Sequence, residues 1–318
     1  MTTSPFSCSV LLPVYNSRAF LFNSVMNILA SLSEFDELLI IDDGSEDMNV
    51  DELRRIRSID SRINLISRPH LGLVHALNFG IREATNELIA RADVDDLYDP
   101  NRIVKQGSYL VKNPEVSAIF SDYRIINRLG RNLGTIPSAV SPELTKFSLI
   151  NHQRTPHPSV MFRKSAVTDV GGYSLNAYPA EDLDLWMRLA ENSMIASIPE
   201  TLLIYLKNDK GITALNNSGM ISKTQELRMT LIRNIDLERV LHEAETSLKN
   251  YETLNLADFR KILFFRDLIT YISLSSNQVS IKRLKDLMKL SSHAKPNLIP
   301  GIIKLGWEKQ IRKRQISY

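Results

Sequence analysis

The sequence predicts an α/β protein in which a mostly parallel sheet is flanked by helices and followed by a helical C-terminal region. Short apolar runs bounded by turn residues alternate with helical patterns in the first part of the chain, as they do in βαβ units. After about Leu206 these runs stop, and long amphipathic helical patterns follow. We therefore expect an α/β domain over residues 1–205 and a helical region over residues 206–318.

Five apolar runs are the strand candidates: Ser9–Pro13, Glu37–Ile41, Ile63–Ile66, Glu87–Ala90 and Ser117–Phe120. Short runs without polar alternation are typical of strands that are buried on both faces. Apolar residues at helical spacing separate the first four runs, within residues 20–29, 53–56 and 73–81. This order predicts strands joined by crossover helices, which makes the neighbouring strands parallel.

Composition excludes several classes of protein. Of the 318 residues, 43% are hydrophobic and 24% are charged, as in a globular protein, and a net charge of +3 is too small to indicate nucleic-acid binding. The single cysteine, Cys8, lies in an apolar run, so we expect a buried inert thiol and neither an intramolecular disulfide nor a thiolate cluster. The chain shows no secretory signal and no run of about 20 apolar residues, so we expect a cytoplasmic protein.

Acidic residues follow two of the predicted strands. Asp42–Ser45 follows the second strand, and Asp93–Asp96, with three carboxylates, follows the fourth. In open α/β sheets, ligands bind beyond the carboxyl ends of the strands. Turn formation and helix capping explain the first cluster as well as ligand binding does.

The second cluster points to a bound cation. The carboxylates of Asp93, Asp95 and Asp96 repel one another, and a divalent cation would supply the missing counter-charge. Hard oxygen ligands suit Mg²⁺ or Mn²⁺, and Mg²⁺ usually takes its other ligands from substrate phosphates and water. An acidic cluster without a P-loop therefore predicts a metal-bridged diphosphate, with a solvated acidic loop as the alternative.

A third acidic group begins a predicted helix. Glu181 and Asp182 precede Leu183, Trp186 and Leu189, which recur at helical spacing. Carboxylates at a helix start interact favourably with the helix dipole, which is one explanation for the pair. A general base above a pocket is the other explanation, and this segment alone does not distinguish the two.

Taken together, seven segments resemble the family 2 glycosyltransferases, which have the GT-A fold. They follow the family's order and spacing: Val10–Asn16, Leu39–Asp47, Gly72–Gly80, Ala90–Arg102, His157–Ser165, Val170–Tyr173 and Ala180–Leu189. The resemblance covers the expected α/β domain, residues 1–205, which it identifies as a nucleotide-sugar-binding catalytic domain. It implies transfer of a single hexose or N-acetylhexosamine from a UDP-sugar to an acceptor hydroxyl, with inversion at the anomeric carbon.

The resemblance also implies roles for single residues. Asp43 falls where the family contacts uracil, and a carboxylate can accept a hydrogen bond from uracil N3–H. Asp182 falls on the general base and Asp95 on the ligand of Mn²⁺ or Mg²⁺. The remaining implied roles are the loop of the base pocket for Pro13 and Tyr15, a place near the ribose for Asp93, and the lining of the active site for His157.

The acceptor expected from this resemblance is a saccharide or lipid-linked saccharide in bacterial surface polysaccharide assembly, such as O-antigen or capsule. The Gln-any-any-Arg-Trp motif of processive synthases is absent from the sequence, which favours transfer of one sugar per encounter. Two alternatives are a catalytically inactive module that binds nucleotide-sugar or membrane, and a sugar nucleotidyltransferase. His70 stands where the family often has a small polar residue, and it receives no role.

The C-terminal tail is basic. Residues 281–318 contain ten Lys and Arg residues and two acidic residues. Ile303, Trp307 and Ile311 recur every four residues, which places them on one helical face among the lysines. Such a helix is typical of a membrane interface, so we expect peripheral contact with the inner face of the cell membrane. Packing of this face on the catalytic domain is the alternative.

Overall fold

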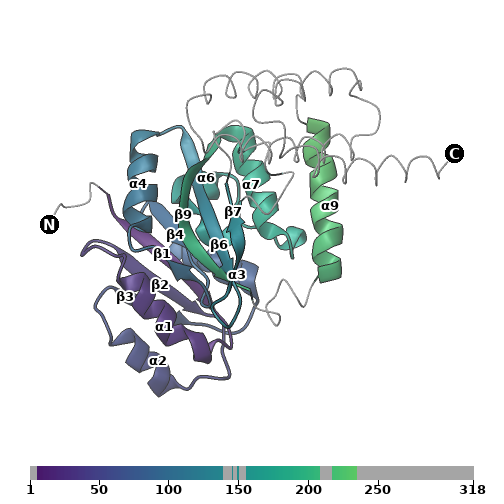
Figure 1. The fold of residues 1–318 in the computed structure, drawn as a ribbon. Helices are drawn as coiled ribbons and strands as arrows, with labels where there is room; N and C mark the ends of the chain where they lie inside the picture. Colours follow the sequence, from purple (N-terminus) through teal and green to yellow (C-terminus); the bar gives the residue numbers. More distant parts are fainter. Residues whose placement is uncertain (1–5, 139–144, 146–148, 150–154, 208–216, 235–318) are drawn as a thin grey trace. The chain divides into compact units, whose positions relative to one another are not determined.

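The computed structural model of the protein describes residues 6–138, 145, 149, 155–207 and 217–234 (Figure 1). Contacts along the chain divide it into two compact units, residues 1–227 and 228–318. The second unit lies outside the described residues except for the last part of helix α9 (Asn217–Asn234). The basic tail predicted at residues 281–318 therefore lies outside the described residues, and so does most of the predicted helical region.

A mixed sheet forms the centre of the first unit. Among the described residues it has nine strands in the order β3-β2-β1-β4-β8-β6-β9-β5, with β7 paired to β6. The strands are β1 (Cys8–Val14), β2 (Glu37–Asp42), β3 (Ile63–Ser67), β4 (Leu88–Arg91), β5 (Leu97–Tyr98), β6 (Val116–Ile126), β7 (Asn132–Ile136), β8 (Met161–Arg163) and β9 (Met194–Leu206). All five predicted strands are present, and β3-β2-β1-β4 are parallel neighbours as expected.

Helices connect the strands and cover both faces of the sheet. They are α1 (Arg18–Leu29), α2 (Val50–Arg57), α3 (Leu73–Glu83), α4 (Arg102–Lys112), α6 (Lys164–Asp169) and α7 (Glu181–Asn192), with short 3₁₀ turns η2 (His157–Ser159) and η3 (Leu175–Ala177). The α/β fold class is thus confirmed. The second half of the sheet adds the antiparallel neighbours β8, β7 and β5, which the sequence patterns did not indicate.

Alternate residues of β1 serve two separate packing layers. Val10 and Leu12 belong to a core that includes Leu21 and Val25 of α1. Leu11 faces the other layer, where Gly80 of α3 packs so closely that an added Cβ would lie 2.2 Å from Leu11 Cδ1. Every residue of β1 is buried, as predicted for a strand covered on both faces.

Cys8 is fully buried in β1, as predicted. Its burial raises the pKa of the thiol, and the nearby charge of Asp36 acts in the same direction. The cysteine is therefore an inert packing residue. Among the described residues, no helix is both long and apolar enough to span a bilayer.

Candidate active site

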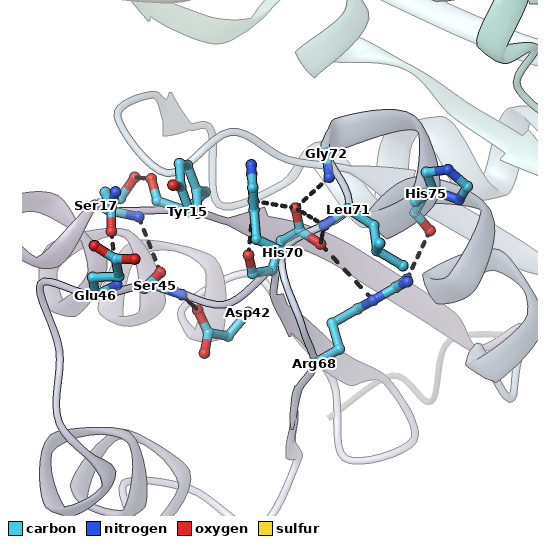
Figure 2. Close-up of polar contacts among 12 residues, drawn as sticks. Tyr15, Ser17, Asp42, Ser45, Glu46, Arg68, His70, Leu71, Gly72 and His75 are labelled. Atoms are coloured by element: carbon cyan, nitrogen blue, oxygen red, sulfur yellow. Dashed lines mark hydrogen bonds and ion pairs between the residues drawn. The ribbon is translucent and has the colours of Figure 1, made fainter.

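Residues at the carboxyl ends of β1, β2 and β3 form one polar cluster, shown in Figure 2. Tyr15 follows β1, Asp43 follows β2, and His70 follows β3. The rings of Tyr15 and His70 are stacked, with centroids 4.0 Å apart and planes 18° from parallel. Pro13, which the resemblance assigned to the loop of the base pocket, instead lies buried inside β1, paired with Ile41 of β2.

The carboxylate of Asp43 connects the residues of this cluster. Its Oδ2 accepts hydrogen bonds from the backbone N–H groups of Gly72 (2.8 Å) and Leu71 (3.3 Å) and lies 2.9 Å from His70 Nδ1. Arg68 Nε lies 3.8 Å from the other carboxylate oxygen. Asp43 is only 3% exposed, so its charge organises the loop that carries His70.

Gly44 brings the β2 and β3 loops into contact. Its backbone has φ of +77°, which disfavours any residue with a Cβ. An added Cβ would also lie 2.7 Å from the backbone nitrogen of His70. The glycine of the Asp42–Ser45 segment is therefore required both by its own conformation and by the approach of His70.

The second acidic cluster contains a counter-charge that sequence analysis missed. Arg91, the last residue of β4, is 4% exposed and forms an ion pair with Asp93. The hydroxyl of Tyr98 accepts a hydrogen bond from the backbone N–H of Asp93 at 2.6 Å. A cation is therefore not the sole charge partner of this cluster, contrary to the reasoning from sequence.

Asp96 takes a structural place in the cluster. It is 1% exposed, and its Oδ1 accepts a hydrogen bond from the backbone N–H of Leu206 at the end of β9 (2.9 Å). Burial raises the pKa of Asp96 well above its ordinary value, and the charge of Asp93 acts in the same direction. The alternative of a solvated acidic loop is thus wrong for Asp96, which faces the protein interior. Asp93 and Asp95 are partly exposed.

The predicted helix start is confirmed at α7, whose first two residues are Glu181 and Asp182. Both are buried, at 5% and 8% exposure. Behind them, Trp186 is fully buried, with its ring 5.8 Å from that of His157. His157 Nε2 lies 2.7 Å from the hydroxyl of Tyr173, so a phenol–imidazole pair lies beside the acids of α7.

The two acidic groups lie on either side of η2: Arg91 N–H donates to the carbonyl of Val160 at 3.0 Å, and His157 of η2 packs on Trp186 of α7. Burial raises the pKa of Asp93 above its ordinary value; Asp95 and Asp182 add to the rise, and Arg91 opposes it. Burial also raises the pKa of Tyr173, with contributions from Asp182 and Glu181 against Arg91. The end of β4 and the start of α7, some 90 residues apart in sequence, therefore face one site.

Hydrogen bonds from α3 and α7 hold the loop that carries Tyr173. Asn78 of α3 donates to the carbonyl of Tyr173 and accepts from its N–H, both at 2.8 Å. Arg188 of α7 donates to the carbonyls of Val170 (2.6 Å) and Gly172 (2.8 Å) and pairs with Asp184. Asp184 therefore has a structural role, as the ion-pair partner of Arg188. Asn78 therefore positions Tyr173.

The carboxylates of Asp93 and Asp95 fit a divalent cation that is shared with a diphosphate. In the described part of the chain, no group of three or more His, Cys, Asp or Glu side chains is arranged to hold a metal alone. Mg²⁺ and Mn²⁺ do not require one, since one or two carboxylates suffice when phosphates and water complete the shell. The hard oxygen donors at the end of β4 meet this requirement.

Comparison with known proteins identifies the family. The model of the family described as "Glycosyl transferase family 2" matches residues 9–171 of this chain. The chain is 28% identical over 228 residues to the UDP-Gal:alpha-D-GlcNAc-diphosphoundecaprenol beta-1,3-galactosyltransferase of Escherichia coli, covering 69% of this chain and 80% of that protein. It is 27% identical to the O-antigen biosynthesis glycosyltransferase WbnJ of Escherichia coli, covering 64% and 80%.

Solved structures support the same fold. S. aureus TarS in complex with UDP-GlcNAc matches with a TM-score of 0.57 at 16% identity, covering 88% of this chain and 83% of that chain. The mannosyltransferase PcManGT of Pyrobaculum calidifontis, in complex with GDP-Man and Mn²⁺, matches with a TM-score of 0.55 at 15% identity, covering 91% and 81%. With the family match over half of its residues, this chain belongs to glycosyl transferase family 2 and is a glycosyltransferase.

Proposed function

We propose that the protein is an inverting glycosyltransferase that moves one hexose or N-acetylhexosamine from a UDP-sugar to an acceptor hydroxyl. One observation carries this proposal: the end of β4 and the start of α7 meet around η2. The backbone N–H of Arg91 donates to the carbonyl of Val160 at 3.0 Å, and the ring of His157 in η2 lies 5.8 Å from that of Trp186 in α7. A diphosphate site beside Asp93 and Asp95 would therefore lie next to the acids of α7. Transfer requires this proximity, because the base must reach an acceptor that attacks the sugar beside the diphosphate.

The chemistry assigned to this chain is a single displacement. The acceptor oxygen forms a bond to the anomeric carbon while the bond from that carbon to UDP breaks, and Asp182 takes the hydroxyl proton. Asp95, with Asp93 beside it, would hold Mn²⁺ or Mg²⁺, which stabilises the negative charge of the departing diphosphate. Arg91 keeps Asp93 in place through their ion pair. His157 orders the Tyr173 side of the site.

The relatives support a role in bacterial surface polysaccharide assembly. One acts on a diphosphoundecaprenol-linked sugar, by its name, and another belongs to O-antigen biosynthesis. TarS has been solved with UDP-GlcNAc. On this basis we propose that this chain uses a UDP-sugar donor and a saccharide or lipid-linked saccharide acceptor, and that it acts at the inner face of the cell membrane.

The experiment that tests the proposal separates chemistry from binding. Asp182→Asn keeps the size of the side chain but removes the base, so transfer should fall by about 10²- to 10⁴-fold. Affinity for UDP should change by no more than about threefold, because Asp182 acts on the acceptor. UDP release from a panel of UDP-sugars with acceptor measures the first quantity, and calorimetry with UDP measures the second.

Glu191→Gln is the matched control, since Glu191 is exposed on the same helix, and it should behave as the wild type. Normal transfer by Asp182→Asn would place the base elsewhere and overturn the assignment. Glu181, buried beside it, would be the next residue to test.

The metal proposal is tested at Asp95. Wild-type enzyme should bind UDP tightly only with Mn²⁺ or Mg²⁺ present, and Asp95→Asn should weaken that binding at least about tenfold by removing a charged ligand. Titration calorimetry with and without EDTA measures both effects. Equal affinity for UDP in EDTA would show that no metal bridges the diphosphate.

A further inference from the structure

The hairpin formed by β6 and β7, which lie side by side in Figure 1, has a basic tip. Residues 123–137 contain no acidic residue and three arginines, all of them exposed: Arg124, Arg128 and Arg131. Lys207, which is also exposed, follows β9 and donates its backbone N–H to the carbonyl of Ile126 at the end of β6 (2.8 Å). Four basic residues therefore lie on or beside the end of the hairpin.

Two exposed leucines lie among these charges. Leu133 is 49% exposed and Leu129 is 92% exposed, the largest exposed fraction of any large hydrophobic residue that the structure describes. A single exposed leucine is common on protein surfaces and needs no explanation. A basic surface that also carries exposed apolar side chains is different, because it matches both the charged and the apolar parts of an anionic lipid surface.

The turn presents Leu129 in a fixed place without requiring a leucine there. The side-chain oxygen of Asn127 accepts hydrogen bonds from the backbone N–H groups of Leu129 (3.0 Å) and Arg131 (2.9 Å). Gly130 has φ of +74° and donates to the carbonyl of Asn127 at 2.9 Å. These bonds use only the backbone of residue 129, so the turn itself gives no reason for an apolar side chain at its most exposed position.

The hairpin projects from the edge of the sheet that carries the candidate active site. Met161 of β8 pairs antiparallel both with Ala90 of β4 and with Ile119 of β6, so β4 and β6 run in the same direction and these two residues lie level. β4 ends at the residue after Ala90, whereas β6 continues to Ile126. At about 3.3 Å per residue, β6 therefore extends roughly 20 Å beyond the end of β4, which the proposed metal ligands follow.

We propose that the tip of this hairpin is a membrane-contact site, in which Leu129 and Leu133 enter the headgroup region of an anionic bilayer and the three arginines bind lipid phosphates. The inference deepens the proposed action at the cell membrane and rests on it. Guanidinium groups form strong, charge-assisted hydrogen bonds with phosphate. A second copy of the chain is a poorer partner, because a symmetric contact would bring the arginines of two tips together.

The contact would orient the enzyme on the bilayer. A tip with two leucines binds a bilayer weakly by itself, so it acts together with the basic C-terminal tail proposed above, and two linked contacts bind far more strongly than either one alone. Contact at the tip turns the carboxyl-end edge of the sheet toward the lipid. That edge carries the candidate active site, so the sugar of a lipid-linked acceptor would approach the site from the bilayer.

A fluorescent label at the tip tests the contact in the full chain. The one cysteine of the sequence, Cys8, is fully buried, so Leu129→Cys supplies a single reactive thiol for an environment-sensitive nitrobenzoxadiazole label. With vesicles of phosphatidylglycerol and phosphatidylcholine, the emission should rise and shift to the blue as the label leaves water. With vesicles of phosphatidylcholine alone, the emission should not change.

Phe35→Cys is the matched control for the label. Phe35 is 59% exposed and precedes β2, so it lies at the opposite edge of the sheet. A label at this position should keep its emission with either kind of vesicle. If the labelled chains float with anionic vesicles and the label at position 129 also keeps its emission, the tip stays in water and the proposal is wrong.

Sedimentation with the anionic vesicles measures how much the tip contributes to binding. Leu129→Gln should lower the partition coefficient by about 5- to 20-fold, because apolar surface returns to water, and Arg131→Gln should lower it about fivefold. Phe35→Gln and Arg57→Gln change exposed residues elsewhere in the same way and should bind as the wild type does. All four variants should keep the wild-type affinity for UDP. Equal losses at the tip and at the control positions would overturn a specific site.

The outcomes separate the inference from the proposed function. A blue shift at position 129 that grows with protein concentration in the absence of vesicles would show contact with a second copy and would overturn the lipid assignment. If the chain transfers sugar to a soluble acceptor but binds no vesicle, the membrane site falls and the proposed reaction stands. If the label enters the bilayer but no sugar is transferred, the site stands and the proposed reaction falls.

Discussion

At the scale of single residues, Gly44 offers a sharp test because its two constraints can be separated. Gly44→Ala introduces strain at φ of +77° and a contact of 2.7 Å with the His70 backbone. Gly130 has φ of +74° but open space around it. Gly130→Ala should lose on the order of 1 kcal/mol of unfolding free energy from backbone strain alone. Gly44→Ala should lose more because its Cβ also meets the His70 backbone, and urea denaturation measures both losses.

Only Gly44→Ala should also weaken UDP binding, since only there does the Cβ displace the His70 loop. Calorimetry with UDP decides this point. If Gly44→Ala binds UDP as tightly as Gly130→Ala does, the His70 loop does not contact the donor.

Sequence analysis found residues whose partners are close in sequence and missed those whose partners are far away. Asp43 and Asp182 stand beside recognisable turn and helix signals. The position of the His70 ring depends on Asp43, 27 residues earlier, and on Tyr15, which is further still. Arg91 is part of a recognised segment, but a charged residue ending a buried strand carries no local sign that it faces Asp93.

At the scale of elements, the pair Asp60–Arg62 at the start of β3 gives stability a pH dependence. Arg62 donates two hydrogen bonds to the Asp60 carboxylate, at 2.9 and 2.8 Å, and a third to the carbonyl of Leu32 at 2.6 Å. Hydrogen bonds from Arg62 lower the pKa of Asp60 to about 2. By holding the guanidinium of Arg62 in place, the Asp60 carboxylate helps to connect the start of β3 to the loop after α1.

A lowered pKa in the folded state means that the ionised form stabilises the fold. The contribution is complete above the unfolded pKa of about 4 and is lost as pH falls toward 2. Asp60→Asn should therefore lower the unfolding free energy at neutral pH, by on the order of 1 kcal/mol after solvent screening. Urea denaturation should show the difference shrinking below about pH 4. A difference that does not depend on pH would contradict this account.

The strands that the sequence predicted are those with uninterrupted apolar runs, β1 and β2 above all. β9, at 13 residues the longest of the described strands, was not predicted because Pro199 and Glu200 interrupt its apolar pattern. Its pairing with β6 shifts register near Asp122, so neither strand has a simple period. β8 has three residues, too few for any periodicity. Tertiary pairing, not local pattern, forms these elements.

At the scale of the whole molecule, the basic tail gives the chain a proposed route to its acceptor. Lys304, Lys309, Arg312 and Lys313 lie around the apolar positions of the tail in sequence. Basic residues near an anionic bilayer contribute on the order of 1 kcal/mol each. The full chain should therefore float with anionic vesicles and not with neutral ones, and added salt should release it.

Replacement of these four residues by Gln should abolish flotation while UDP binding stays unchanged. A chain that ignores anionic vesicles at low salt would show that the tail packs on protein, and the membrane assignment would lose its support from sequence.

The hydrogen bond from Leu206 to Asp96, which spans 110 residues, has a consequence for biosynthesis. The N-terminal part of the chain leaves the ribosome first. Strands β1 to β4 can therefore pair early, while β9 emerges much later. Until Leu206 leaves the exit tunnel, Asp96 has no partner from β9, and the strand that pairs with β6 is missing. Nascent chains therefore complete the contacts of Asp96, and the sheet around it, only after β9 has been synthesised and has left the ribosome.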